Sequence, residues 1–165
     1  MPILDPNSVE FFSHSPDQTR RVGMRLGALL IGGDVVCLSG DLGTGKTTLV
    51  QGITRGWGSL DPVSSPTFVL VNMYRRPDLQ VLFHLDAYRL TNSWEAEDLD
   101  INLMIEQGSL VIEWPERITS ILPEDHLWVS MSWIGDEQRR MQFTFHGNRY
   151  QEVLFKLRRL IFGGS

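Results

Sequence analysis

The chain is constrained most by a glycine-rich segment of eight residues that separates an apolar run from a helical pattern. Residues 40–47 read Gly-Asp-Leu-Gly-Thr-Gly-Lys-Thr and match the phosphate-loop pattern GxxxxGK[ST] at every fixed position. The run before it, residues 34–39, is nearly continuous in apolar side chains, as in a strand buried on both faces of a parallel sheet. Residues 47–57 after it repeat apolar side chains with helical spacing. A strand, a glycine turn and a helix in this order predict an α/β fold that binds phosphate at the end of the strand.

Each part of this segment suits the binding of a nucleoside triphosphate. Glycine lets the backbone turn tightly, so that successive N–H groups point at phosphate oxygens, and the following helix adds its positive end. Lys46 provides a compact charge for the β- and γ-phosphates, and it is one of two lysines in a chain with thirteen arginines. The hydroxyl of Thr47 is a suitable ligand for Mg²⁺.

We therefore predict ATP and Mg²⁺ as cofactors. No Asn-Lys-x-Asp sequence of the kind that reads guanine is present. A plain glycine-rich turn with a surface lysine is the alternative. The predicted nucleotide-binding residues of the loop are Gly40, Gly43, Thr44, Gly45, Lys46, Thr47 and Thr48.

Further strand and helix patterns surround the loop. Ser15, Pro16 and Gln18 form a capping signal for a helix that we expect to end at Gly32-Gly33. Apolar runs predict strands, and an acidic segment with helical character predicts a helix. The expected strands are residues 67–74, 81–86 and 109–113, and the expected helix is 93–107.

The C-terminal third predicts a hairpin and a helix. Residues 127–133 and 140–146 alternate apolar and polar side chains around Gly135-Asp136. The residues that follow place apolar side chains from Tyr150 to Ile161 on one helical face. We predict a single nucleotide-binding domain over residues 1–165, α/β and similar to P-loop NTPases. Its central sheet should be mostly parallel, flanked by helices, with an antiparallel portion.

Two acidic residues stand at predicted strand ends. Asp86 ends the run 81–86 and Glu113 ends the run 109–113. A phosphate-loop site needs such a carboxylate to hold the magnesium shell or to position water, although either residue alone reads equally well as a solvated acid. His84 lies on the same strand face as Asp86, and we interpret it as a hydrogen-bonded, partly buried histidine rather than a metal ligand.

Composition limits the class of protein. The net charge of −5 argues against broad nonspecific nucleic-acid binding. No apolar run approaches the ~20 residues of a membrane helix. Cys37 is the single cysteine, which fits a reducing compartment. We expect a cytoplasmic protein without membrane contact.

Four motifs together resemble the TsaE family, P-loop ATPases of bacterial tRNA threonylcarbamoyladenosine biosynthesis. The loop at 40–48 is similar to that family's phosphate loop, which often has Ala at the position of Thr44. Ser65-Pro66-Thr67-Phe68 is similar to its switch-like segment, and residues 84–90 (HLDAYRL) are similar to its HxDxYRL signature. Residues 113–117 (EWPER) match its sequence at that place.

The resemblance implies a function and residue roles. An ATPase of this family binds the heterodimer that transfers the threonylcarbamoyl group, TsaB and TsaD, and nucleotide turnover resets that complex. Thr47 and Glu113 would hold Mg²⁺, Asp86 would assist hydrolysis or the metal shell, and Trp114 and Arg117 would lie near the nucleotide. The implied catalytic residues are Lys46, Asp86 and Glu113.

Contact with tRNA would be mainly indirect, through the complex. The basic C-terminal residues Arg149, Lys156, Arg158 and Arg159 fit either a solvated helix face or a tRNA contact. Two other functions fit the phosphate loop: a small-molecule kinase, and an ATP-responsive binding module without turnover. Against the kinase, no arginine-rich lid segment follows the central strands.

Overall fold

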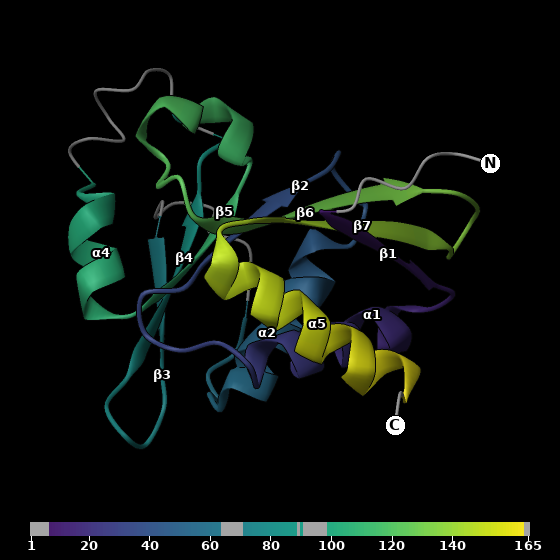
Figure 1. The fold of residues 1–165 in the computed structure, drawn as a ribbon, viewed down its shortest axis with the longest axis horizontal. Helices are drawn as coiled ribbons and strands as arrows, with labels where there is room; N and C mark the ends of the chain where they lie inside the picture. The colour runs from purple at the N-terminus through teal and green to yellow at the C-terminus, as the bar shows by residue number, and fades with distance from the viewer. Residues whose placement is uncertain (1–6, 64–70, 89, 91–98, 164–165) are drawn as a thin grey trace.

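A seven-stranded sheet forms the centre of the molecule in a computed structural model that describes residues 7–63, 71–88, 90 and 99–163 (Figure 1). The strands are β1 (Ser8–Ser13), β2 (Val35–Ser39), β3 (Val71–Arg75), β4 (Val81–Asp86), β5 (Ser109–Glu113), β6 (His126–Trp133) and β7 (Arg139–His146). The α-helices are α1 (Pro16–Gly27), α2 (Lys46–Trp57), α4 (Ile101–Gln107) and α5 (Asn148–Phe162). Two 3-10 turns, η1 (Pro115–Arg117) and η2 (Thr119–Ile121), follow β5.

The sheet is parallel in its centre and antiparallel at both edges. Its order is β1-β7-β6-β2-β5-β4-β3. The neighbours β6, β2, β5 and β4 run parallel, whereas β7, β1 and β3 are added antiparallel. The C-terminal ends of four adjacent strands therefore meet at one edge, which is where ligands bind in open parallel sheets. This arrangement confirms the predicted α/β class with its antiparallel portion.

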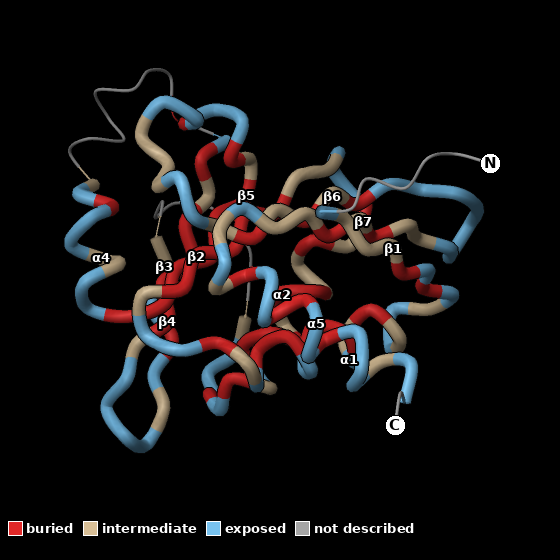
Figure 2. Tube along the Cα trace, in the orientation of Figure 1, coloured by how far each residue is buried: buried red, intermediate tan, exposed pale blue. Residues whose placement is uncertain are grey.

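Helices cover both faces of the sheet, so its central strands are buried on both sides (Figure 2). Alternate residues of β2 show this division. Val36 and Leu38 belong to a core with α1, α2 and α5, and Val35 and Cys37 belong to a second core with α4 and the segment after β5. In the part of the chain that the structure describes, no helix combines the length and apolar character needed to cross a membrane.

The first predicted helix is shorter than expected. It begins after Ser15, whose side chain accepts a hydrogen bond from the N–H of Gln18, but it ends at Gly27 and not at Gly32. Residues 28–33 form a turn because a partly buried ion pair between Arg149 and Asp34 holds their backbone. Asp34 accepts from the N–H of Ile31 (2.8 Å), and Arg149 donates to the carbonyl of Leu29 (2.8 Å) and to Asp34.

Strand β1 and the start of helix α4 also differ from the prediction, and two further ranges lie outside the described residues. Strand β1 was not predicted; it pairs with β7, more than 120 residues away, and Phe11 packs edge-on against Phe143 at 5.1 Å. Helix α4 begins only at Ile101, with the Asp100 side chain as its cap. Residues 64–70 and 91–98, which include parts of a predicted strand and helix, lie outside the described residues.

Helices α1 and α2 touch backbone to backbone. Glycines face the contact from both helices: Gly23 and Gly27 from α1, and Gly52 and Gly56 from α2. A Cβ atom on Gly52 would lie 2.2 Å from the carbonyl oxygen of Arg20, and one on Gly27 would lie 2.0 Å from that of Ile53. The two helices reach their observed separation only because these four positions lack side chains.

We expect Gly52→Ala to destabilise the protein by about 1–3 kcal/mol, because the new methyl group forces the helices apart. In an exposed helix interior the same substitution stabilises by ~1 kcal/mol, so the sign of the effect tests the packing. Urea unfolding measures it. The matched control is Gly32→Ala, whose Cβ would lie 3.8 Å from the nearest side-chain atom, and an equal midpoint for both variants would contradict the argument.

Candidate nucleotide-binding site

The phosphate loop joins β2 to α2 through backbone conformations that favour glycine. Gly40, Gly43 and Gly45 have φ angles of 149°, 80° and 100°. Gly45 is the N-cap of α2 and has no side chain to occupy the first N–H groups of the helix. Thr44 is buried, and its hydroxyl donates to the carbonyl of Asp41 at 2.8 Å, which closes the loop on itself.

Lys46 is buried in the first turn of α2, with 6% of its surface exposed. Its ammonium donates to the carbonyl of Gly40 and lies 3.9 Å from the ring centroid of Trp114. Burial lowers the pKa of Lys46, while the carboxylates of Glu113, Glu116, Asp86 and Asp41 act in the opposite direction. The first turn contains no acidic residue, and a cation at a helix N-terminus opposes the helix dipole. An anion bound at this helix end would offset both costs.

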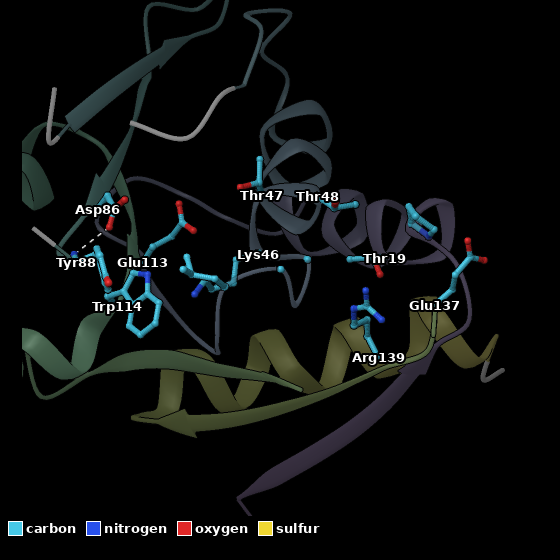
Figure 3. A pocket seen from close by; sticks show the side chains of 14 residues that line it. Thr19, Lys46, Thr47, Thr48, Asp86, Tyr88, Glu113, Trp114, Glu137 and Arg139 are labelled. Carbon is cyan, nitrogen blue, oxygen red and sulfur yellow. Dashed lines mark hydrogen bonds between the residues drawn. The ribbon is translucent and has the colours of Figure 1, made fainter. Parts of the chain in front are cut away.

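A pocket of about 650 Å³ opens at this loop, and most of the predicted site residues line it (Figure 3). The predicted residues in the lining are Gly43, Gly45, Lys46, Thr47, Thr48, Asp86, Glu113 and Trp114. Figure 3 shows Asp86, Glu113 and Trp114 on one side of Lys46, and Thr19, Glu137 and Arg139 on the other. The pocket therefore has Asp86 and Glu113 on one side of Lys46, and Glu137 and Arg139 on the other.

Asp86 and Glu113 occupy neighbouring positions on parallel strands, because the register of β4 and β5 pairs them directly. Glu113 is buried with 5% exposure, and its Oε2 lies 2.6 Å from Nε2 of His84. Asp86 accepts from the N–H of Tyr88 at 2.9 Å, and burial raises the pKa of its carboxyl. His84 is hydrogen-bonded, as predicted, but it is fully buried and not partly buried.

Two hairpin residues that the sequence did not predict support the loop. The indole N–H of Trp133, at the end of β6, donates to the carbonyl of Gly43 at 3.1 Å. Nε of Arg139, at the start of β7, donates to the carbonyl of Thr44 at 3.1 Å. Carbonyls held by these donors point toward the hairpin, so the hairpin fixes the peptide planes of the loop. The partners are 90 and 95 positions apart in the sequence, so no local pattern predicts these contacts.

Three predicted residues do not line the pocket. Gly40 and Thr44 serve inside the loop, as the acceptor for Lys46 and as the donor to Asp41. Arg117 is exposed, with its guanidinium 5.2 Å from the ring centroid of Tyr88, which does line the pocket. The segment 65–68, expected to act as a switch, lies outside the described residues.

The donor set fits a nucleotide with magnesium. A hydroxyl from Thr47 and two carboxylates are oxygen ligands, which Mg²⁺ prefers. Among the described residues no group of three or more His, Cys, Asp or Glu side chains is placed to hold a metal ion. Magnesium is usually bound by one or two carboxylates together with phosphate oxygens and water.

Comparisons with known proteins identify related chains. The family model "Threonylcarbamoyl adenosine biosynthesis protein TsaE" matches residues 13–141. A relative from Bacillus subtilis (strain 168), named tRNA threonylcarbamoyladenosine biosynthesis protein TsaE, is 36% identical over 146 residues, or 88% of this chain and 90% of the relative. One of the same name from Streptomyces coelicolor is 40% identical over 137 residues, covering 79% and 93%. The crystal structure of Bacillus subtilis YdiB superposes with a TM-score of 0.77 at 30% identity, covering 93% of this chain and 95% of that one.

We expect Arg139→Gln to weaken binding of a non-hydrolysable ATP analogue by about 2- to 12-fold, the cost of one hydrogen bond to the loop. Calorimetric titration measures the dissociation constant. Arg140→Gln is the matched control, because Arg140 pairs instead with Glu10 of β1. Equal affinity of the Arg139 variant and the wild type would show that the hairpin does not support the loop.

Proposed function

The chain belongs to the TsaE family, and we propose that it binds and hydrolyses ATP with Mg²⁺ in the threonylcarbamoyladenosine modification of tRNA. One observation carries the ATP site. The buried ammonium of Lys46 shares a pocket with Thr47 and with the neighbouring carboxylates of Asp86 and Glu113, at the C-terminal edge of the parallel strands. The role in tRNA modification rests on the family and on the printed names of the relatives.

The side chains divide the chemistry between binding and hydrolysis. The glycine-rich loop and the N-terminus of α2 receive phosphate oxygens, and the Lys46 ammonium neutralises charge on the β- and γ-phosphates. A bound Mg²⁺ would supply positive charge against the negative charge that develops on the transferring phosphate. Thr47 and Glu113 would hold the ion, and Asp86 would orient its water shell or the attacking water. Trp114 covers Lys46 and excludes water from that side.

The opposite end of the pocket would receive the nucleoside. In this direction the pocket passes Thr48 and reaches Thr19 of α1 and two hairpin residues, Glu137 and Arg139. Arg117 would approach the nucleotide only through Tyr88.

The partner we propose is the threonylcarbamoyl transferase heterodimer of the TsaB and TsaD type, with tRNA contacted mainly through that complex. The charges of the described C-terminal helix support indirect contact. Arg149 is engaged by Asp34, and Lys156 pairs with Glu152 at 2.9 Å. Arg158 and Arg159 stay exposed on α5, but the net charge of −5 argues against broad nonspecific binding of a nucleic acid. A cytoplasmic location stays a prediction from the single cysteine.

We expect Lys46→Ala to abolish detectable binding and hydrolysis of ATP, because no other described side chain of the loop supplies a positive charge. Undiminished ATPase activity in this variant would defeat the assignment of the site. Binding is measured by calorimetry and turnover by phosphate release.

Glu113→Gln and Asp86→Asn should instead reduce turnover more than nucleotide affinity, since these groups act on the transferring phosphate and its water. We expect losses of 10-fold or more in kcat, with changes of a few-fold in the dissociation constant. Equal losses in both quantities would indicate a purely structural role.

The pathway assignment is tested by ATP hydrolysis with and without the two transferase subunits. We expect slow turnover alone and faster turnover with the heterodimer. Unchanged turnover, together with rapid phosphate transfer to a small hydroxyl compound, would favour the kinase. Nucleotide-dependent partner binding without any turnover would favour the binding module.

A further inference from the structure

A buried line of three polar side chains runs from the edge of the sheet to the pocket. His84 of β4 has no exposed surface, and its two ring nitrogens each meet a side chain from a neighbouring strand. Nδ1 lies 3.0 Å from the hydroxyl of Tyr74 on β3, and Nε2 lies 2.6 Å from Oε2 of Glu113 on β5. Tyr74 itself is 3% exposed. The line therefore crosses three adjacent strands and ends at a pocket residue.

The chemistry of the partners fixes the direction of these hydrogen bonds. A carboxylate only accepts, so Nε2 of His84 must carry the proton that it donates to Glu113. In the neutral ring Nδ1 is then an acceptor, and the hydroxyl of Tyr74 donates to it. The carboxylate of Glu113 thus requires the proton on Nε2, and the Tyr74 hydroxyl fits this tautomer as a donor to Nδ1.

This donor engages one oxygen of Glu113 and leaves the other available to the pocket. A histidine that donates to a carboxylate restricts the rotation of that carboxylate, as outer-shell partners do for metal ligands. Filling the core does not require a histidine at this position, because Leu82, on the same face of the same strand, fills it with an apolar side chain. Burying three polar groups is costly unless each is paired, which these are.

We propose that His84, held by Tyr74, is a positioning residue that orients the Glu113 carboxylate toward magnesium and its water. This inference rests on the proposed function, because it assigns a purpose to Glu113 within the ATP site. It deepens that function because it adds Tyr74 of the edge strand β3 to the residues that act on the site. Tyr74 does not line the pocket and acts on it through His84 and Glu113.

The nucleotide-free protein gives the first test. Long-range ¹H–¹⁵N correlation spectra of the imidazole groups report which ring nitrogen carries the proton. We expect a proton on Nε2 of His84, and we expect Tyr74→Phe to change the Nδ1 shift. An Nε2 atom without a proton would overturn the proposal, because the ring would then offer Glu113 no donor.

The second test compares side chains at position 84. We expect His84→Phe to lower kcat about 10- to 100-fold and to raise the magnesium concentration that half-saturates binding of a non-hydrolysable ATP analogue. Binding of that analogue without magnesium should stay within 2-fold of the wild type. His84→Gln keeps a donor near Nε2 and should recover a large part of both losses. Unchanged magnesium dependence in a folded His84→Phe protein, or no recovery with glutamine, would overturn the proposal.

Tyr74→Phe removes one hydroxyl and keeps the shape of the core, so it decides the question if His84→Phe does not fold. We expect a loss of about 2- to 10-fold in magnesium affinity and in kcat. Tyr150→Phe is the matched control, because Tyr150 is also buried and its hydroxyl accepts from the N–H of Val35, away from the pocket. Equal effects of the two substitutions would assign Tyr74 to general stability and overturn its role.

Failure of the proposed function would be recognisable separately. A wild-type protein that binds the ATP analogue with magnesium but never hydrolyses ATP would refute the ATPase. The spectra and the magnesium dependence of analogue binding would still test the line from Tyr74 to Glu113, since neither measurement needs turnover.

Discussion

The burial of the Lys46 ammonium is the constraint on which the rest of the site depends. A buried cation is costly unless polar partners replace its water. Its partners come from two places: the carbonyl of Gly40 within the loop, and the ring of Trp114 just after β5. Trp114 reaches that position in a left-handed backbone conformation, with φ at 58°. The end of β5 must therefore lie beside the end of β2, which their parallel register provides. A compact ammonium fits this enclosure better than the wide guanidinium that the chain uses almost everywhere else.

The position of Lys46 depends in turn on how α2 packs against α1. That helix lies against α1 with no side chain between the two backbones at Gly52 and Gly27. The same close contact determines where the start of α1 lies, and Pro16 and Thr19 from that end line the pocket. Close packing of the two helices thus sets both the depth of the phosphate loop and the far wall of the pocket. Stability and site geometry depend here on the same four glycines.

Local patterns predicted those parts of the fold and site that adjacent residues determine. The strand before the loop, the start of α2 within one residue, the strand ending at Glu113 and the hairpin of β6 and β7 all follow from apolar spacing and turn residues. The acidic pair was predictable because parallel strands end at one edge, and the register then brings Asp86 beside Glu113. The pairing of β1 with β7 was not, since a short strand reads ambiguously without its distant partner. The early end of α1 was not predictable either, because the turn after it is held by Asp34 and by Arg149, which is 115 positions further along the chain.

Local patterns also did not predict that strand β3 and the β6-β7 hairpin support the site. The C-terminal edge of the parallel strands brings together the groups that we propose to act on phosphate: Lys46, Asp86 and Glu113. Other groups hold them. Tyr74 of the edge strand β3 reaches Glu113 through His84 of β4, and Trp133 and Arg139 of the β6-β7 hairpin hold carbonyls of the loop. Loop and carboxylate are thus held from opposite sides of β2 and β5. A displacement of β3 or of the hairpin would therefore change one half of the site and leave the other half in place.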